Sequence, residues 1–100
     1  MPTLGKELRK TITNLEKIRD SLDSPSDKLL AKLDKLYERQ EALVDAAIDN
    51  NSEAYKTATE AMAEAAKATE AALADLKKLD QTISSVADAL GKVATLLARV

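Results

Sequence analysis

The spacing of apolar residues in the second half of the chain constrains its fold more than any other feature. From residue 52 to the end, apolar or small residues recur alternately three and four positions apart without a slip. A repeat of this kind places one residue of every turn on the same side of an α-helix and is typical of coiled-coil-like packing. The segment has no proline and a single glycine, Gly91, so we expect one long helix over about residues 52–99, with a break near residues 80–82 as the alternative. The repeat consists of Tyr55, Ala58, Met62, Ala65, Thr69, Ala72, Leu76, Leu79, Ile83, Val86, Leu90, Val93, Leu97 and Val100.

Two amphipathic helices are predicted in the first half. The first covers about residues 4–22, where apolar residues three or four apart alternate with charged ones. The next two residues of note, Ser24 and Pro25, predict the start of a second helix, with Ser24 as the N-cap and Pro25 at the first helical position. The second helix is expected over about residues 25–48, and it ends at the helix-breaking run Asp49-Asn50-Asn51 before a new cap at Ser52.

These elements predict an all-α protein with a single domain over residues 1–100. A reversal near residues 50–51 makes the chain an antiparallel helical hairpin, whose N-terminal arm is broken at Pro25 and whose other arm is the long C-terminal helix. In that hairpin Leu15 lies opposite Val86 and Leu8 lies opposite Val93. A two-helix hairpin buries one stripe per arm and is rarely stable alone, so we expect two hairpins to dimerise into a four-helix bundle. A monomeric up-down four-helix bundle is the alternative.

Composition narrows the possible partners. The chain has 15 basic and 17 acidic residues, well mixed, and a net charge of −2, which argues against nucleic acid as a partner. The N-terminal residues lack the apolar stretch of a signal peptide, and no apolar run approaches the ~20 residues that span a bilayer. We therefore expect a cytoplasmic protein that does not insert into membranes, with export by a signal-independent route as the other possibility.

The chain lacks the residues that most enzymatic mechanisms need. The chain has no histidine and no cysteine, which excludes Ser-His-Asp and Cys-His nucleophiles and thiolate zinc sites. Gly5 and Gly91 are isolated, so no glycine-rich loop cradles a phosphate. Carboxylates one helical turn apart, such as Glu60 and Glu64, are interpreted as a solvated face. We expect no catalytic residue, no metal ligand, no cofactor and no small-molecule substrate.

The segment from residue 83 to residue 100 is the most informative for function, because it carries only three charged residues and a broad apolar arc. Three explanations compete: burial in a dimer, packing inside a monomeric bundle, or docking to another protein or a membrane surface. Tyrosine is enriched at interfaces, so Tyr37 joins this face as a candidate contact. The candidate interface residues are Tyr37, Ile83, Val86, Leu90, Val93 and Leu97.

Two polar residues stand in otherwise apolar seams. Gln40 interrupts the apolar seam of the second predicted helix, and Thr69 interrupts the seam of the long helix. A polar residue at such a position often sets the register or the oligomeric state of a bundle, at some cost in stability. Exposure at the edge of a narrow stripe is the other interpretation.

The predicted format, about 100 residues folded at the midpoint into a helical hairpin that pairs, is similar to that of the small secreted WXG-type proteins. The resemblance is one of shape, since the chain has no tryptophan and turns on Asp49-Asn50-Asn51. The sequence predicts a non-enzymatic protein–protein interaction module (an adaptor, chaperone or small structural component), with itself and another helical protein as partners. A lipid-surface protein that uses residues 83–100, or a small exported hairpin protein, is the alternative.

Overall fold

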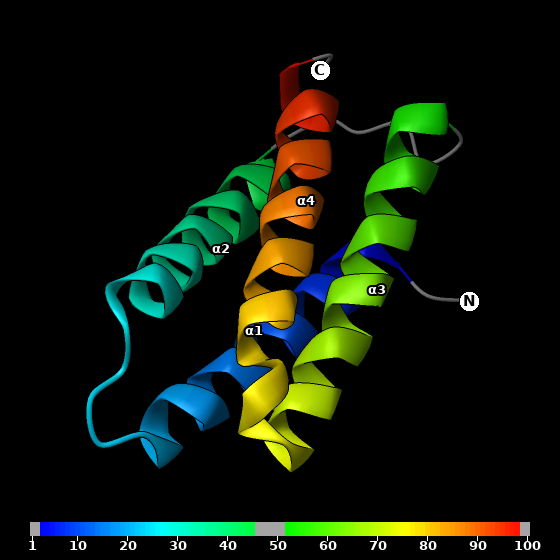
Figure 1. The fold of residues 1–100 in the computed structure, drawn as a ribbon. Coiled ribbons are helices and arrows are strands. Elements are labelled where there is room, and N and C mark those ends of the chain that lie inside the picture. Colours follow the sequence, from blue (N-terminus) through cyan, green and yellow to red (C-terminus); the bar gives the residue numbers. More distant parts are fainter. Residues whose placement is uncertain (1–2, 46–51, 99–100) are drawn as a thin grey trace.

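The computed structural model describes residues 3–45 and 52–98 of the chain, and the side chains of residues 44 and 45 are not described. Over these residues the chain is all-helical and contains no strand (Figure 1). The predicted fold class is therefore confirmed at the level of all-α. The helices are α1 (Leu4–Ser21), α2 (Asp27–Asp45), α3 (Glu53–Ala74) and α4 (Leu79–Ala98), with a short 3-10 turn η1 (Leu76–Lys78) before α4.

Side-chain caps define the starts of three helical segments. Thr3 accepts a hydrogen bond from the Lys6 N–H at the start of α1. Ser52 accepts one from the Tyr55 N–H at the start of α3, which confirms the cap predicted there. At the start of α2 the prediction is wrong by two residues. Ser26, not Ser24, accepts the Leu29 N–H at 3.2 Å, and Pro25 precedes the helix. The predicted reversal at residues 49–51 lies outside the described residues.

The prediction of one long C-terminal helix is wrong, because the helix breaks at Asp75 rather than continuing or breaking near residues 80–82. Asp75 has an extended backbone, with φ −146° and ψ 100°, and its carboxylate accepts the Lys77 N–H at 3.1 Å. Aspartate is a weak helix former and a good cap, so it tolerates this role. Burial favours the break, because folding α4 back against α3 places its apolar residues in the same core.

Each helix packs against two others, in an arrangement that differs from the predicted hairpin. α3 packs against α4 and α1, and α2 packs against α1 and α4. Within the described residues, α1 does not approach α4 and α2 does not approach α3, so these pairs are diagonal. The predicted pairing of Leu15 with Val86 and of Leu8 with Val93 across an antiparallel hairpin is therefore wrong.

The helix directions follow from contacts between α1 and α3. The Leu4 N–H donates to the Tyr55 hydroxyl at 3.3 Å, and the Asn14 amide donates to the Thr69 hydroxyl at 3.0 Å. The two helices consequently run parallel, while α1–α2 and α3–α4 are antiparallel neighbours (Figure 1). Residues 22–26 and 75–78 then lie at the same end of the molecule, which we call the connection end.

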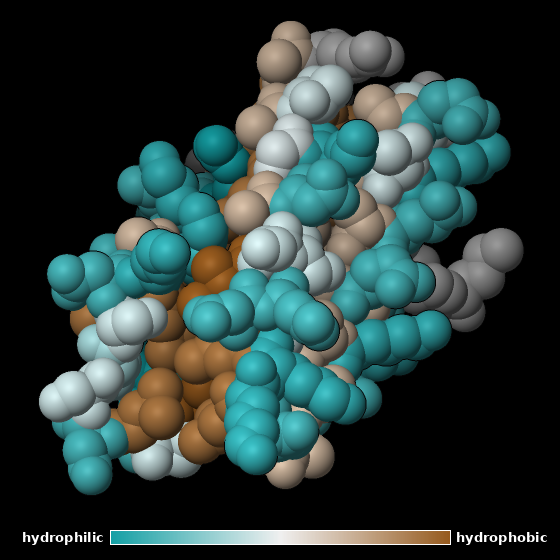
Figure 2. Space-filling model, in the orientation of Figure 1, coloured by the Kyte–Doolittle hydropathy of each residue, from teal (hydrophilic) through white to brown (hydrophobic). Residues whose placement is uncertain are grey.

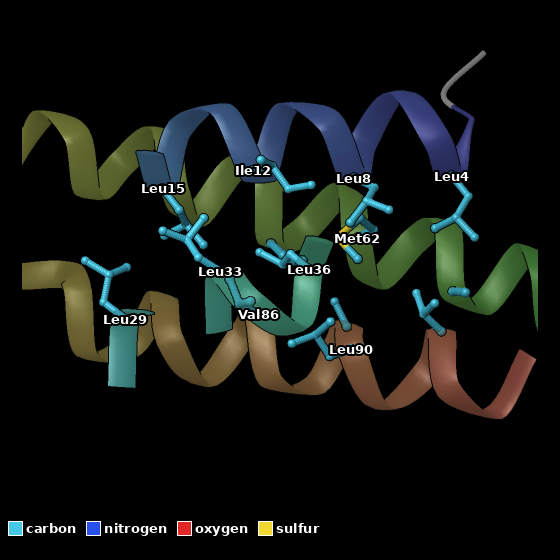
Figure 3. Packing of buried hydrophobic residues seen from close by; sticks show 14 of the residues in the cluster. Leu4, Leu8, Ile12, Leu15, Leu29, Leu33, Leu36, Met62, Val86 and Leu90 are labelled. Carbon is cyan, nitrogen blue, oxygen red and sulfur yellow. The ribbon is translucent and has the colours of Figure 1, made fainter. Parts of the chain in front are cut away.

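The core lies between the four helices and is closed within one chain. The apolar residues of the stripe predicted for residues 4–22 are all buried in this core, except Leu22, which is half-buried. α3 contributes alanines and Met62, so its neighbours approach closely, and α4 contributes residues such as Val86 (Figure 3). The core residues are Leu4, Leu8, Ile12, Leu15, Ile18, Leu29, Leu33, Leu36, Ala58, Met62, Ala65, Ala72, Val86, Ala89, Leu90, Val93 and Leu96.

Candidate interaction surface

The predicted interface residues of α4 divide between the core and its edge. Val86 and Val93 are fully buried inside the chain, and Leu90 is nearly so. Ile83 and Leu97 are half-buried and pack against the edge of this core. Burial within a single chain thus accounts for the centre of this apolar arc, and among the candidate interface residues of α4 Ile83 and Leu97 stay partly exposed.

The buried face of α4 is rotated away from the predicted seam. Thr82, Ala89 and Leu96 lie outside the heptad positions, yet all three are buried. The Thr82 hydroxyl lies 3.0 Å from the carbonyl oxygen of Ala68 in α3 and equally close to that of Lys78. Small residues on α3 let α4 approach on this side, so the burial centre shifts toward α3.

Thr69 and Gln40, the two polar seam residues, have different surroundings. Thr69 is fully buried; its hydroxyl donates to the Ala66 carbonyl oxygen at 2.7 Å and accepts from the Asn14 amide. This pair joins α1 to α3 at one register, and a buried polar group that is satisfied in only one arrangement favours that arrangement. Gln40 is half-buried on α2.

Tyr37 lies on the outside of the α1–α2 pair, with 36% of its surface exposed. Its hydroxyl donates to Glu16 Oε2 at 2.7 Å. This hydrogen bond raises the pKa of Tyr37 above its ordinary value near 10; partial burial adds to the shift and Arg19 opposes it. Tyr37 therefore joins α2 to α1, while part of its ring stays available to a partner.

We expect Glu16→Gln to lower the pKa of Tyr37 toward its ordinary value, because the charged acceptor is removed. A raised pKa means that the fold favours the neutral phenol, so this contribution to stability is complete below about pH 10 and is lost as the pH rises through the folded-state pKa. Phenolate absorbance, measured in a Tyr55→Phe background with and without Glu16→Gln, reports Tyr37 alone. An unchanged titration midpoint would show that Glu16 does not hold the phenol.

Exposed leucines gather at the connection end, a feature that the periodicity did not reveal. Leu30 at the start of α2, Leu73 at the end of α3 and Leu76 in η1 are 39%, 37% and 43% exposed. Leu22 and Leu79 are half-buried at the same end. Figure 2 shows apolar surface extending here between α2 and the first turns of α4. We call Leu22, Leu30, Leu73, Leu76 and Leu79 the connection-end leucines. Leu76 belongs to the predicted seam, and the break at Asp75 removes it from the continuous helix in which that seam would be buried, whereas Leu73 lies in α3 outside the seam.

Two surface hollows elsewhere are small and polar. One, of about 280 Å³, lies between α1 and α3 and is lined by Lys6, Arg9, Lys10, Thr13, Asn14 and Glu70. The other, of about 230 Å³, lies between α3 and α4 and is lined by Glu53, Ala54, Thr57, Lys92 and Thr95. Both fall below the ~300–1,000 Å³ of typical ligand pockets, and their lining residues are mostly polar or charged, without the aromatic and large aliphatic side chains common in such sites.

The described helices include none that is both long enough and apolar enough to cross a membrane. Among the described residues, no group of three or more acidic side chains is placed to hold a metal ion. The chain matches no protein-family model, and comparisons with curated proteins and with solved structures likewise gave no match.

Proposed function

We propose that this protein is a non-enzymatic interaction module that pairs with a second copy of itself through the connection end. The observation that carries the proposal is the gathering of Leu30, Leu73 and Leu76 at this one end; among the side chains that the structure describes, they are three of the four large apolar ones that are exposed. Scattered single leucines on a surface need no explanation, whereas a contiguous apolar area marks a contact site.

Helix packing is the chemistry that the proposed surface offers. The connection-end leucines are aliphatic, and the half-buried Ile83 extends them along the edge of α4. Such surfaces are complementary to other apolar helix faces, and a second copy presents the same set. Side chains that activate nucleophiles or bind transition metals, histidine and cysteine, are missing from the chain. These features support an adaptor, chaperone or structural role rather than catalysis.

Sedimentation and light scattering from low micromolar to several hundred micromolar protein test the proposal. We expect the weight-average mass to rise toward that of a dimer, and we expect the rise to be lost in a Leu30→Ser, Leu73→Ser double variant. Ala31→Ser, at an exposed position next to Leu30, is the matched control and leaves pairing unchanged. Mass that stays monomeric over this range overturns the proposal. Co-flotation of that monomer with anionic lipid vesicles would favour the lipid-surface alternative.

A further inference from the structure

We propose that two copies pair by exchanging α4. In the exchanged dimer, residues 75–78 straighten, so α3 and α4 become one continuous helix. The α4 of each copy then packs in the four-helix core of the other copy, at the position that the other copy's own α4 has vacated. The inference rests on the proposed self-association and specifies how it occurs. It combines the predicted long helix with the observed four-helix core, since each half of the dimer retains that core.

The sequence of the connection suits a straight helix. Ala72, Leu76, Leu79 and Ile83 continue the 3–4 spacing through the break without a slip, and residues 71–82 contain neither glycine nor proline. No described residue has positive φ, so the turn contains no residue that requires a bend. A continuous helix from the start of α3 to the end of α4 would be about 69 Å long at 1.5 Å per residue.

The bend is confined to a small number of hydrogen bonds around Asp75. The Asp75 N–H still donates to the Ala71 carbonyl oxygen at 2.9 Å, which is a normal helical bond. Beyond it, the extended backbone of Asp75 is compensated by its side-chain cap on Lys77 and by a bond from the Lys78 N–H to its carbonyl oxygen at 3.0 Å. Straightening replaces these contacts with main-chain helical bonds, so the local difference between bent and straight forms is small.

The exposure of Leu73 and Leu76 is explained by the exchanged form. The two residues are three positions apart and share one side of a continuous helix. In the exchanged dimer the two straightened segments meet at the centre of the molecule, where Leu73 and Leu76 of each copy can pack against those of the other. In the single chain the same side chains are 37% and 43% exposed.

Simple end-to-end contact offers too little surface for a stable dimer. The molecule measures 40 × 22 × 17 Å along its principal axes, and an end with the two shorter dimensions has an area of roughly 300 Å², against about 800 Å² per partner in a standard interface. Exchange re-forms the extensive packing of α4 against α3 and α2 between chains and adds the new contact at the hinge. The apolar end therefore favours exchange over face-to-face docking.

Cysteines introduced at Ala68 and Thr82 distinguish the possibilities, because these residues of α3 and α4 are in contact and the natural chain has no cysteine. The double variant is equilibrated at high concentration, oxidised, and analysed by denaturing electrophoresis without reductant. Exchange predicts a covalent dimer that is absent from both single-cysteine controls. A protein that sediments as a dimer but gives only intrachain disulfide overturns exchange and leaves the proposed self-association intact. A protein that sediments as a monomer overturns both.

Two hinge substitutions test the mechanism in opposite directions. Leu76→Pro suits the bent form, because Leu76 is the first residue of η1 and follows an extended residue, but it is incompatible with the interior of a straight helix. We expect it to stay monomeric with unchanged helicity by circular dichroism. Asp75→Ala removes one cap of the bent form per chain, and each loss shifts the equilibrium about fivefold toward the straight form, so the dimer dissociation constant should fall about 25-fold. A dimer that persists in Leu76→Pro, or an unchanged dimer constant in Asp75→Ala, overturns the exchange.

Discussion

Ala89→Glu is expected to unfold the protein or nearly so, whereas Leu97→Glu is expected to be tolerated. Ala89 is fully buried beside the heptad seam, in the same core as Val86 and Val93, and a glutamate there would force an unpaired carboxylate into a closed core. Unpaired buried charge and overpacking together cost more than ~3 kcal/mol, a large share of the ~5–15 kcal/mol that stabilises a domain of this size. The melting temperature should fall by more than ~12 °C.

Leu97→Glu provides the matched comparison, because the same residue is introduced on the same helix. Leu97 is half-buried at the edge of the core, and the glutamate carboxylate can reach water there. We expect a loss of about 1 kcal/mol from the reduced apolar burial. Urea denaturation followed by circular dichroism measures both variants. A larger loss for Leu97→Glu than for Ala89→Glu would restore the heptad seam as the buried face of α4.

The contrast between these two positions shows how far periodicity predicts burial. On α1, large apolar residues three and four apart define a narrow stripe with charges on both sides, and the structure buries that stripe. On α4 the arc is broad and rich in alanine, which is compatible with either core or surface. Its buried side is therefore decided by which helix approaches most closely, and this depends on the whole arrangement rather than on the local pattern.

The pairing of the helices and the break at Asp75 were beyond sequence reasoning for a related reason. The local sequence of residues 71–79 favours a continuous helix. The free energy gained by burying α4 against α3 and α2 outweighs that local preference. A chain reversal near the midpoint suggested sequential antiparallel pairing, but α2 and α3 are diagonal. The apolar stripes do not encode which stripe faces which. The connection-end leucines follow from these same two features, so the candidate site was no more predictable than the break.

The second large effect is expected from Leu15→Ala, compared with Leu30→Ala. Leu15 is fully buried in the core, on the side of α1 that packs against α2 and α3 (Figure 3). Leu30 is 39% exposed at the connection end. Truncating a buried leucine removes its transfer free energy and leaves a cavity, at a cost of about 2–5 kcal/mol. The same truncation at a partly exposed position leaves little cavity and should cost below about 1 kcal/mol.

Chemical denaturation at low protein concentration measures both leucine variants in the monomer, and sedimentation at high concentration measures their pairing. We expect Leu15→Ala to lose stability, whereas Leu30→Ala should keep stability and weaken self-association. Equal losses of stability would mean that Leu30 belongs to the core of the single chain. A stable Leu30→Ala variant that pairs as well as the natural chain would remove Leu30 from the contact. The pair of measurements separates what a leucine contributes to folding from what it contributes to binding. That separation matters in a protein whose proposed dimer is held by the same helix packing that holds its core.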